Sequence, residues 1–440
     1  MPKATAPKVS KAPKTAKAQS AGELDERFGL RTLNFPGASK TIGHGVAITP
    51  SGQIMVSATV EVSDLSYYGL ARLDANGNPD PGFGNDGYLL GQFGNGLLSQ
   101  AGQLIVDATG RIYLCGVIGE SKDTAIDYQQ VIARFLPDGS PDTEFGDDDD
   151  DHKSGYRIVP TRIPLLTGAT GGGLILAKST PLAAEPDRLL FVTSQKGSGL
   201  LTRFHLDGSD DSSFAANGWI VLTLAGVAIS LRGIIQLGDG LILVHGKTEI
   251  TNQGLVMAFD SSGTVAEAFG NKGTLLLNLQ KDGKPLESSV EQIIAQTSER
   301  LLLLGSAVEA SAGDKFQHAF ISGITHTGET DETFNGKYPV ITPATGTLDL
   351  RSWTEGFALD DSAGHRIVTV GQTSGGTRGL LTGGFLANGA VDPAFNVEGA
   401  AQIEWPAKSA CMQNSSVLVL GNRNGRAQLI RLLTASVSDL

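Results

Sequence analysis

Short apolar runs, each followed by turn residues, recur along almost the whole chain. They read GRIYLCG at 110–116, GLILVHG at 240–246, RLLLLG at 300–305 and HRIVTVG at 365–371. Runs of this length that end in glycine are typical of buried strands. The 57 glycines among 440 residues indicate many tight turns. Together these features predict an all-β protein.

A second element alternates with these runs: a strand, an Asp-Gly or Asn-Gly turn, and then Asp-x-x-Phe. It reads LARLDANGNPDPGFGNDG at 70–87, IARFLPDGSPDTEFG at 132–146 and LTRFHLDGSDDSSFAANG at 201–218. Weaker copies lie at 257–273, 321–336 and 383–396, and the copy at 22–29 lacks the preceding strand. We expect the repeated phenylalanine and aspartate to be structural anchors: Phe28, Phe83, Phe145, Phe214, Phe269, Phe334 and Phe395, with Asp25, Asp80, Asp142, Asp211, Asp331 and Asp392.

Successive anchoring phenylalanines are 55, 62, 69, 55, 65 and 61 residues apart. A period near sixty with four short strands per unit is typical of a propeller blade. The chain opens with an anchor and one strand, and it closes with the complementary strands SSVLVLGNRNGRAQLIRLLT at 415–434. We therefore predict a seven-bladed β-propeller over residues 22–440. Pairing of the N-terminal outer strand with the C-terminal strands would close the ring and remove two exposed sheet edges.

These units resemble the bacterial delta-60 repeat in their arginine-containing strand, Asp-Gly turn and Asp-x-x-Phe-Gly. The resemblance covers nearly the whole chain after residue 21 and is best in the units ending at Phe83 and Phe145. It is poor in the unit ending at Phe269, where Ala266 replaces the aspartate. The resemblance implies a propeller-like array and no settled activity, so no catalytic residue is carried over from it.

Several units also carry an arginine on the strand before the turn. Arg72, Arg134 and Arg203 precede the turn glycine by five residues, and Arg431 is equivalent in the closing unit. We expect each arginine to pair with the anchor aspartate of its own unit. The units of Asp331 and Asp392 have no arginine at this position.

The charge of the chain is unevenly distributed. Its net charge is −12, yet residues 1–20 hold five lysines and no acidic residue, so removing those five positive charges leaves −17 for the rest. An acidic body repels phosphate groups, and we expect no binding to nucleic acid. Residues 1–21, rich in Lys, Ala and Pro, are predicted to be a disordered leader without the apolar region of a secretion signal. No run approaches the length of a membrane span. We expect a cytoplasmic monomer, with leaderless export as the open alternative.

Few linear motifs in the sequence indicate a metal site or a reactive residue. The segment from Asp74 to Asp80 resembles the start of a calcium loop, but its twelfth position is Asn85 instead of glutamate, which favours a simple turn. The acidic run 147–151 beside His152 is typical of a solvated loop, with a site for a divalent cation or a basic partner as the alternative. Cys115 and Cys411 fit small buried hydrophobes. We expect no metal and no cofactor, with Ca²⁺ left open by the first pattern.

Four titratable residues fall at similar positions on the innermost strands of different units: His44, Arg232, Glu291 and Glu355. Such residues would converge at the mouth of the axial channel, where we place a candidate binding site. The alternative is that they are solvated strand-end residues. We expect a non-enzymatic binding or scaffold propeller that recognises a protein or glycan partner through its loops or axial face. The alternative is a hydrolase or lyase with its active site at the same mouth.

Overall fold

The computed structural model describes residues 19–94, 98–122, 125–149, 152–160, 169–177, 187–195, 197–311, 314–343, 350–361, 364–374, 379–395 and 403–436. Most of the expected leader, residues 1–18, lies outside this range. Its last residues, Gln19–Ala21, lie on the folded body, where Ala21 is buried and forms a bridge with Phe395.

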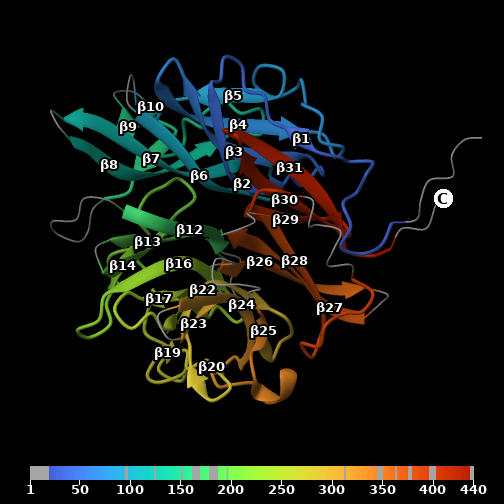
Figure 1. Cartoon of the computed structure of the whole chain (residues 1–440). Coiled ribbons are helices and arrows are strands. Elements are labelled where there is room, and N and C mark those ends of the chain that lie inside the picture. The colour runs from blue at the N-terminus through green and yellow to red at the C-terminus, as the bar shows by residue number, and fades with distance from the viewer. Residues whose placement is uncertain are drawn as a thin grey trace, which may run out of the picture.

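The described residues form seven blades of antiparallel strands around a common axis (Figure 1), which confirms the predicted fold; the strands of blades V and VI are joined in one sheet. Blade I consists of β2 (Lys40–Ile48), β3 (Ile54–Val62), β4 (Leu65–Leu73) and β5 (Tyr88–Gly91), and blade II of β6 (Leu98–Val106), β7 (Ile112–Lys122), β8 (Ala125–Phe135) and β11 (Tyr156–Ile158). Blade III consists of β12 (Ala169–Ala177), β13 (Arg188–Gln195), β14 (Ser198–Phe204) and β15 (Trp219–Leu222), and blade IV of β16 (Ile229–Gln236), β17 (Ile242–Thr248), β18 (Gly254–Phe259) and β19 (Thr274–Leu276).

Blades V to VII follow the same order from the axis outward. Blade V consists of β22 (Glu287–Ala295), β23 (Arg300–Ser311), β24 (Asp314–Thr325) and β25 (Val340–Thr342), and blade VI of β26 (Leu350–Asp361), β27 (Gly364–Ser374) and β28 (Gly379–Leu386). Blade VII consists of β29 (Ala407–Gln413), β30 (Ser416–Arg423), β31 (Arg426–Leu433) and β1 (Arg31–Thr32). Smaller elements outside the blades are β9 (Asp148–Asp149), β10 (His152–Lys153), β20 (Gln280–Lys281), β21 (Lys284–Pro285) and the 3-10 turn η1 (Asn335–Lys337).

Blade VII is built from both ends of the chain, as predicted. Its outermost strand β1 pairs antiparallel with β31, with Arg31 opposite Leu429 and Thr32 opposite Gln428. The innermost strands of neighbouring blades contact each other around the whole ring, including β29 of blade VII and β2 of blade I. In Figure 1 the red end of the chain accordingly lies beside the blue beginning.

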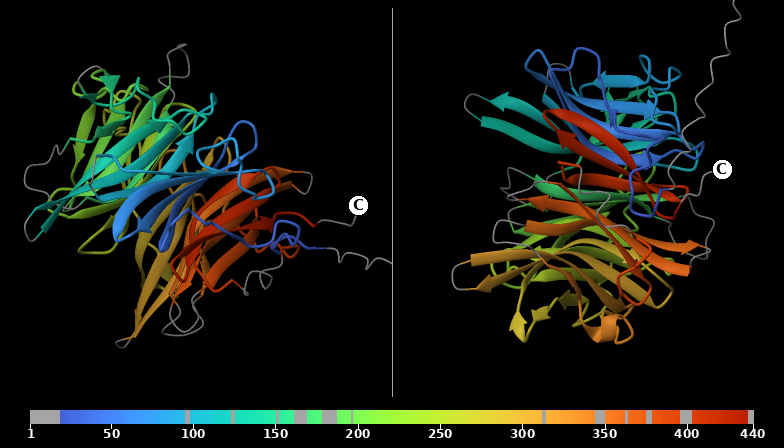
Figure 2. Two further views of the ribbon diagram at one scale, coloured as in Figure 1. Left: turned by 90° about the horizontal axis from the view of Figure 1, so that it is seen from above. Right: turned by 45° about the vertical axis from the view of Figure 1, so that its right-hand side comes forward.

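The longest hairpins lie in blades II and V. Strands β7 and β8 each have 11 residues, and β23 and β24 each have 12. Figure 2 shows these hairpins projecting beyond the body of the ring. At its tip the blade V hairpin also meets blade VI, where β24 pairs with β26 in parallel through Gln317 and Leu350.

Each repeated phenylalanine lies at the seam between two blades. All seven rings are at most 4% exposed. The ring of Phe83 packs beneath the turn glycine of the next blade, so a Cβ built on Gly139 would lie 2.8 Å from the ring. Gly139 also has φ +92°, a conformation that residues with side chains rarely adopt. The turn that contains Gly139 therefore covers the aromatic ring of Phe83 in the previous blade.

The arginines and aspartates of the repeat reinforce the same seams. Arg134 Nε donates to Asp142 Oδ2 at 2.8 Å, and the guanidinium carbon lies 5.2 Å from the ring centre of Phe145. The same arginine donates through Nη1 to the backbone carbonyl of Leu206 in the next blade. The pairs within the other blades are Arg72–Asp80 at 2.9 Å, Arg203–Asp211 at 2.8 Å and Arg431–Asp25 at 2.6 Å. This confirms the pairing expected from the sequence.

Blades V and VI supply the arginine from a different strand. Arg300 and Arg366 lie near the start of the second strand of their blades, where Arg300 pairs with Asp331 and Arg366 Nη1 lies 3.5 Å from Asp392 Oδ2. Both also donate to a backbone carbonyl in the next blade. Six blades thus carry a charged clamp that links the blade to its neighbour.

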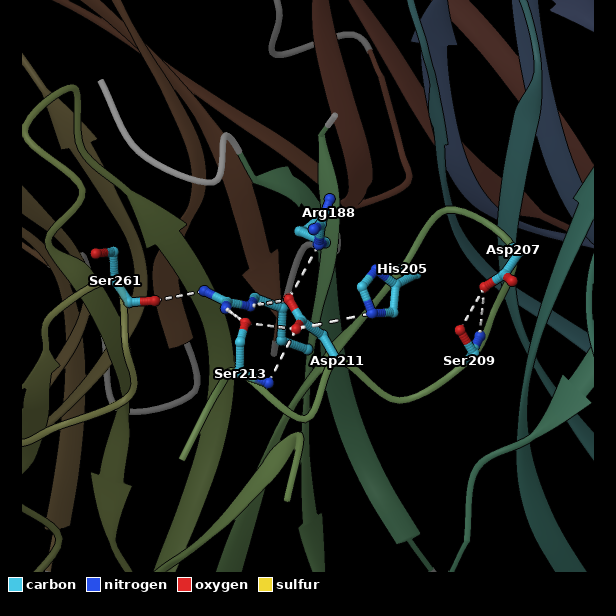
Figure 3. A network of polar contacts seen from close by, with 8 residues as sticks. Arg188, His205, Asp207, Ser209, Asp211, Ser213 and Ser261 are labelled. Carbon is cyan, nitrogen blue, oxygen red and sulfur yellow. Dashed lines mark hydrogen bonds and ion pairs between the residues drawn. The ribbon is translucent and has the colours of Figure 1, made fainter. Parts of the chain in front are cut away.

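The clamp around Asp211 is the most elaborate (Figure 3). Asp211 Oδ2 accepts from Arg203 Nε at 2.8 Å and from Arg188 Nε at 3.0 Å, and its Oδ1 accepts from Ser213. Burial opposes ionisation of Asp211, but the hydrogen bond from Ser213, the charge of Arg203 and the hydrogen bond from Arg188 outweigh it and lower the pKa to about 2.

In blade IV, apolar residues take the place of the Arg–Asp clamp. Leu241, Ala258 and Ala266 occupy the positions that Arg188, Arg203 and Asp211 hold in blade III, as the strand registers show. These residues pack with Phe269 in the largest of the hydrophobic clusters. The replacement of the aspartate by Ala266, noted in the sequence, is therefore compensated by apolar packing.

Candidate functional site in the axial channel

Each of the seven innermost strands contains a β-bulge at the same height. The register with the second strand shifts at Gly43/Gly45, Ala101/Leu104, Thr170/Gly172, Leu231/Gly233, Val290/Gln292, Trp353/Glu355 and Ala407/Ser409. A bulge leaves an extra residue unpaired and redirects its side chain. The extra residues are His44, Gly102 with Gln103, Gly171, Arg232, Glu291, Thr354 and Lys408.

The glycine that ends each repeated apolar run makes room for the bulge. Gly246, Gly305 and Gly371 lie on the second strand opposite the residue before the bulge. A Cβ built on Gly305 would lie 1.9 Å from the backbone oxygen of Ser289, and the corresponding distance at Gly371 is 2.0 Å. The run-plus-glycine pattern in the sequence is therefore the signature of the bulge.

Replacing Gly305 by alanine is expected to destabilise the protein by about 1–3 kcal/mol, because either the bulge or the second strand must move. Chemical denaturation measures the change. Gly238→Ala is the matched control, since no atom lies within 4 Å of a Cβ built there. Equal stability of the two variants would contradict the role given to Gly305.

Two adjoining cavities lie where the bulged residues meet. The first has a volume of about 320 Å³ and is lined by residues that include His44, Gln103, Gln130, Arg232 and Lys408. The second, of about 240 Å³, is lined by residues that include Arg232, Glu291, Gln292, Thr354 and Glu355. Arg232 and Gln103 line both. All six bulged residues whose side chains are described, counting Gln103 for blade II, line one of these cavities.

The structure thus brings the four residues singled out in the sequence to one place. His44 and Arg232 line the first cavity, and Arg232, Glu291 and Glu355 line the second. Sequence reasoning missed Lys408 and Gln103. A usable signal existed, because Lys408 lies thirteen residues before Gly421 just as Gln103 does before Gly116. In blade VI the extra residue is Thr354, one position before the glutamate chosen from the sequence.

The second cavity holds two carboxyl groups in different surroundings. Glu291 Oε2 lies 3.6 Å from Arg232 Nε, an ion pair at the surface of the channel. Among the described residues, no Lys or Arg side chain is paired with Glu355, whose Oε2 accepts a hydrogen bond from Gln292 Nε2 at 2.8 Å. Burial of its carboxyl group raises the pKa of Glu355 to about 8. Glu355 is therefore mainly protonated at neutral pH.

The histidines that face the cavities are neutral. His44 Nε2 lies 2.8 Å from the hydroxyl of Thr59. Burial and the charge of nearby Lys408 lower the pKa of His44 to about 4, and burial does the same for His245 in the second cavity. The thiols of Cys115 and Cys411 are also neutral, since burial raises the pKa of each to about 12. The positive charges that face the first cavity are thus Arg232 and Lys408.

The ring of His44 is expected to stay neutral until the pH falls to about 4, and Lys408→Met is expected to raise this pKa while leaving it below 6.5, because burial remains. Titration of the imidazole signals by NMR, with His44→Gln for assignment, measures both values. Lys284→Met, a change to an exposed lysine in β21, should leave the midpoint of His44 unchanged. A wild-type midpoint near 6.5 would contradict the environment described for His44.

The structure shows no metal-binding cluster in the part of the chain that it describes. No group of three or more His, Cys, Asp or Glu residues there is placed to hold an ion. In the calcium-like segment, Asp74 Oδ1 accepts the backbone N–H groups of Asn76 and Asn78, as in a simple turn. In the acidic run, residues 150–151 lie outside the described residues.

Comparison with known proteins supports the fold. Residues 49–83 and 109–145 match the model of a domain of unknown function (DUF5122) described as a beta-propeller. This match falls in blades I and II, the units in which the repeat is clearest. No curated protein matches the chain in sequence.

Solved structures that resemble the chain are distant. A mannose phosphorylase, MPT-4 from Leishmania mexicana, is 10% identical, with coverage of 93% of this chain and 91% of that chain and a TM-score of 0.32. Sqt1 from Chaetomium thermophilum is 12% identical, with coverage of 90% and 95% and a TM-score of 0.41. The GH43 β-1,3-galactosidase BT0265 is 7% identical, with coverage of 74% and 69% and a TM-score of 0.33. Within the described residues, no helix is long and apolar enough to cross a membrane.

Proposed function

We propose that this chain is a non-enzymatic binding propeller whose axial channel recognises a small polar ligand, best described as a glycan. The observation that carries the proposal is the set of bulges, which directs a polar or charged side chain from six blades into two adjoining cavities. Amides, hydroxyls and charged groups converging in a concave site are the usual features of a ligand pocket. Strands of a closed ring hold them more rigidly than loops would.

The family assignment and setting of the protein follow as proposals. We propose that the units are delta-60 repeats, given the motif and the match of two of them to a propeller family. The protein would act as a cytoplasmic monomer, and the projecting hairpins of blades II and V would give a protein partner a second surface.

A hydrolase or lyase is the second candidate, because one specific observation favours it. The second cavity holds Glu355, protonated at neutral pH, together with Glu291, which is ion-paired with Arg232. A protonated acid and a carboxylate in one cavity are the groups that general acid–base catalysis needs.

Filling the channel tests the proposed function. Gln103 is exposed and lines both cavities, so Gln103→Trp should block ligand entry with no loss of thermal stability. Binding of a panel of mono- and disaccharides, neutral and charged, is measured by calorimetry on both proteins. The proposal predicts binding by the wild type that the variant loses. Equal binding by both proteins, or no binding by either, would refute a channel site.

The same panel separates the binding protein from the enzyme. Products are followed by chromatography after long incubation with the wild type and with Glu355→Gln. The binding proposal predicts no turnover by either protein. Turnover by the wild type that Glu355→Gln abolishes would favour the second candidate.

A further inference from the structure

The first cavity differs in charge from the rest of the protein. Arg232 and Lys408 line it, whereas no aspartate or glutamate is among the described residues that line it. Lys408 is exposed to the channel and has no ion-pair or hydrogen-bond partner among the described residues. Residues 21–440 nevertheless carry a net charge of −17, so this basic cavity lies inside an acidic molecule. Such a contrast concentrates anions in the cavity and repels them from the outer surface.

When the residues that line the second cavity are counted as well, the net charge of the lining stays positive. With His44, His245 and Glu355 neutral near pH 7, the charged residues among the described residues that line the two cavities are Arg232, Lys408 and Glu291. One positive charge is therefore left without a counter-charge. An anionic group bound between Lys408 and Arg232 would supply this counter-charge and would accept charge-assisted hydrogen bonds.

The residues that line the second cavity determine which chemical groups the rest of the ligand can carry. Glu291 presents a carboxylate there, so a second anionic group on the ligand would be repelled. Glu291, Gln292, Thr354 and the carboxyl group of Glu355 offer hydrogen-bond acceptors and donors of the kind that hydroxyl groups satisfy. The ligand should therefore have one anionic end and one hydroxylated end.

We infer that the axial channel binds an anionic sugar, with its carboxylate or phosphate group in the first cavity between Lys408 and Arg232 and its hydroxyl groups in the second. This inference rests on the proposed function and specifies its ligand class. Uronic acids and sugar phosphates share the required chemistry.

Calorimetry with the full chain at neutral pH and low salt tests the inference. The probes are glucuronate, glucose 6-phosphate, glucose, glucosamine and succinate. Glucuronate or glucose 6-phosphate is expected to bind roughly tenfold more tightly than glucose, which is the size of effect for a hydrogen bond to a charged group. The tighter of the two identifies the anionic group. Succinate is expected to bind no more tightly than glucose, because its second carboxylate meets Glu291.

Lys408→Met should reduce the affinity for the anionic sugar to roughly the affinity of the wild type for glucose. Lys284→Met, which removes a positive charge from the outer hairpin β20–β21, should change neither. If glucose or glucosamine binds at least as tightly as the anionic sugars, or if Lys408→Met has no effect, the inference is wrong. Binding of glucose that Gln103→Trp abolishes would then leave the proposed function standing. Failure of every probe to bind at millimolar concentration would overturn the inference and the proposed function together.

Discussion

A chain that begins at residue 37 is expected to lose most of its stability and its single cooperative unfolding transition. The deletion removes β1 and the buried side chains of Phe28, Leu33 and Phe35. Burying three such side chains stabilises a fold by about 5–9 kcal/mol, which is comparable to the whole stability of many domains. The deletion also leaves β31 as an exposed edge and deprives Arg431 of Asp25.

Calorimetric unfolding measures this effect. The control is a chain that begins at residue 19, which lacks only residues 1–18 of the predicted leader and should unfold at the wild-type temperature. If the chain that begins at residue 37 melts as cooperatively and at the same temperature as the control, blade VII does not depend on the N-terminal strand.

Asp211→Ala is expected to destabilise the protein by about 3–5 kcal/mol, the usual cost of removing one partner from a buried ion pair. Asp211 is 2% exposed, and its loss leaves Arg203 and Arg188 without their shared carboxylate. The pKa of Asp211 is lowered to about 2, so its contribution is complete above the ordinary aspartate pKa and is lost as the pH falls towards 2. The difference between wild type and variant should therefore shrink between pH 4 and pH 2.

Blade IV provides the matched rescue. The triple variant Arg188→Leu, Arg203→Ala, Asp211→Ala copies Leu241, Ala258 and Ala266 into blade III. Replacing a buried ionic group by apolar residues is often close to neutral, so the triple variant should be more stable than Asp211→Ala alone. Urea unfolding of the wild type, Asp211→Ala and the triple variant at pH 7 measures this difference in stability. A triple variant less stable than the single one would show that the charges do more than satisfy each other.

The sequence predicted the architecture well, because the repeat period and the complementary ends depend only on residues along the chain. It predicted the Arg–Asp pairs in those blades where both residues belong to one repeat motif. It could not predict the pairs of Arg300 and Arg366, because these arginines come from a neighbouring strand and strand register determines which side chains meet.

The candidate site was predictable in position but not in detail. A bulge shifts the register by one residue, so an alignment by residue count chose Glu355 where the structure places Thr354. Lys408 was overlooked because the closing blade is divided between the two ends of the chain. The protonation of Glu355 and the net positive charge of the channel could not be predicted, since both follow from burial that exists only once the ring is closed.

Closure of the ring can be tested directly by a disulfide between β1 and β31. Thr32 and Gln428 face each other, their side chains are in hydrogen-bond contact at 3.3 Å, and the neighbouring bond from Leu33 N to Ala427 O marks them as a non-hydrogen-bonded pair. Such pairs bring the Cα atoms to about 4.5 Å, within the range for a disulfide. Thr32→Cys with Gln428→Cys should form an intramolecular disulfide under mild oxidation, detected by mass spectrometry, and should raise the unfolding temperature. Two thiols that stay free in the folded monomer would contradict a closed ring.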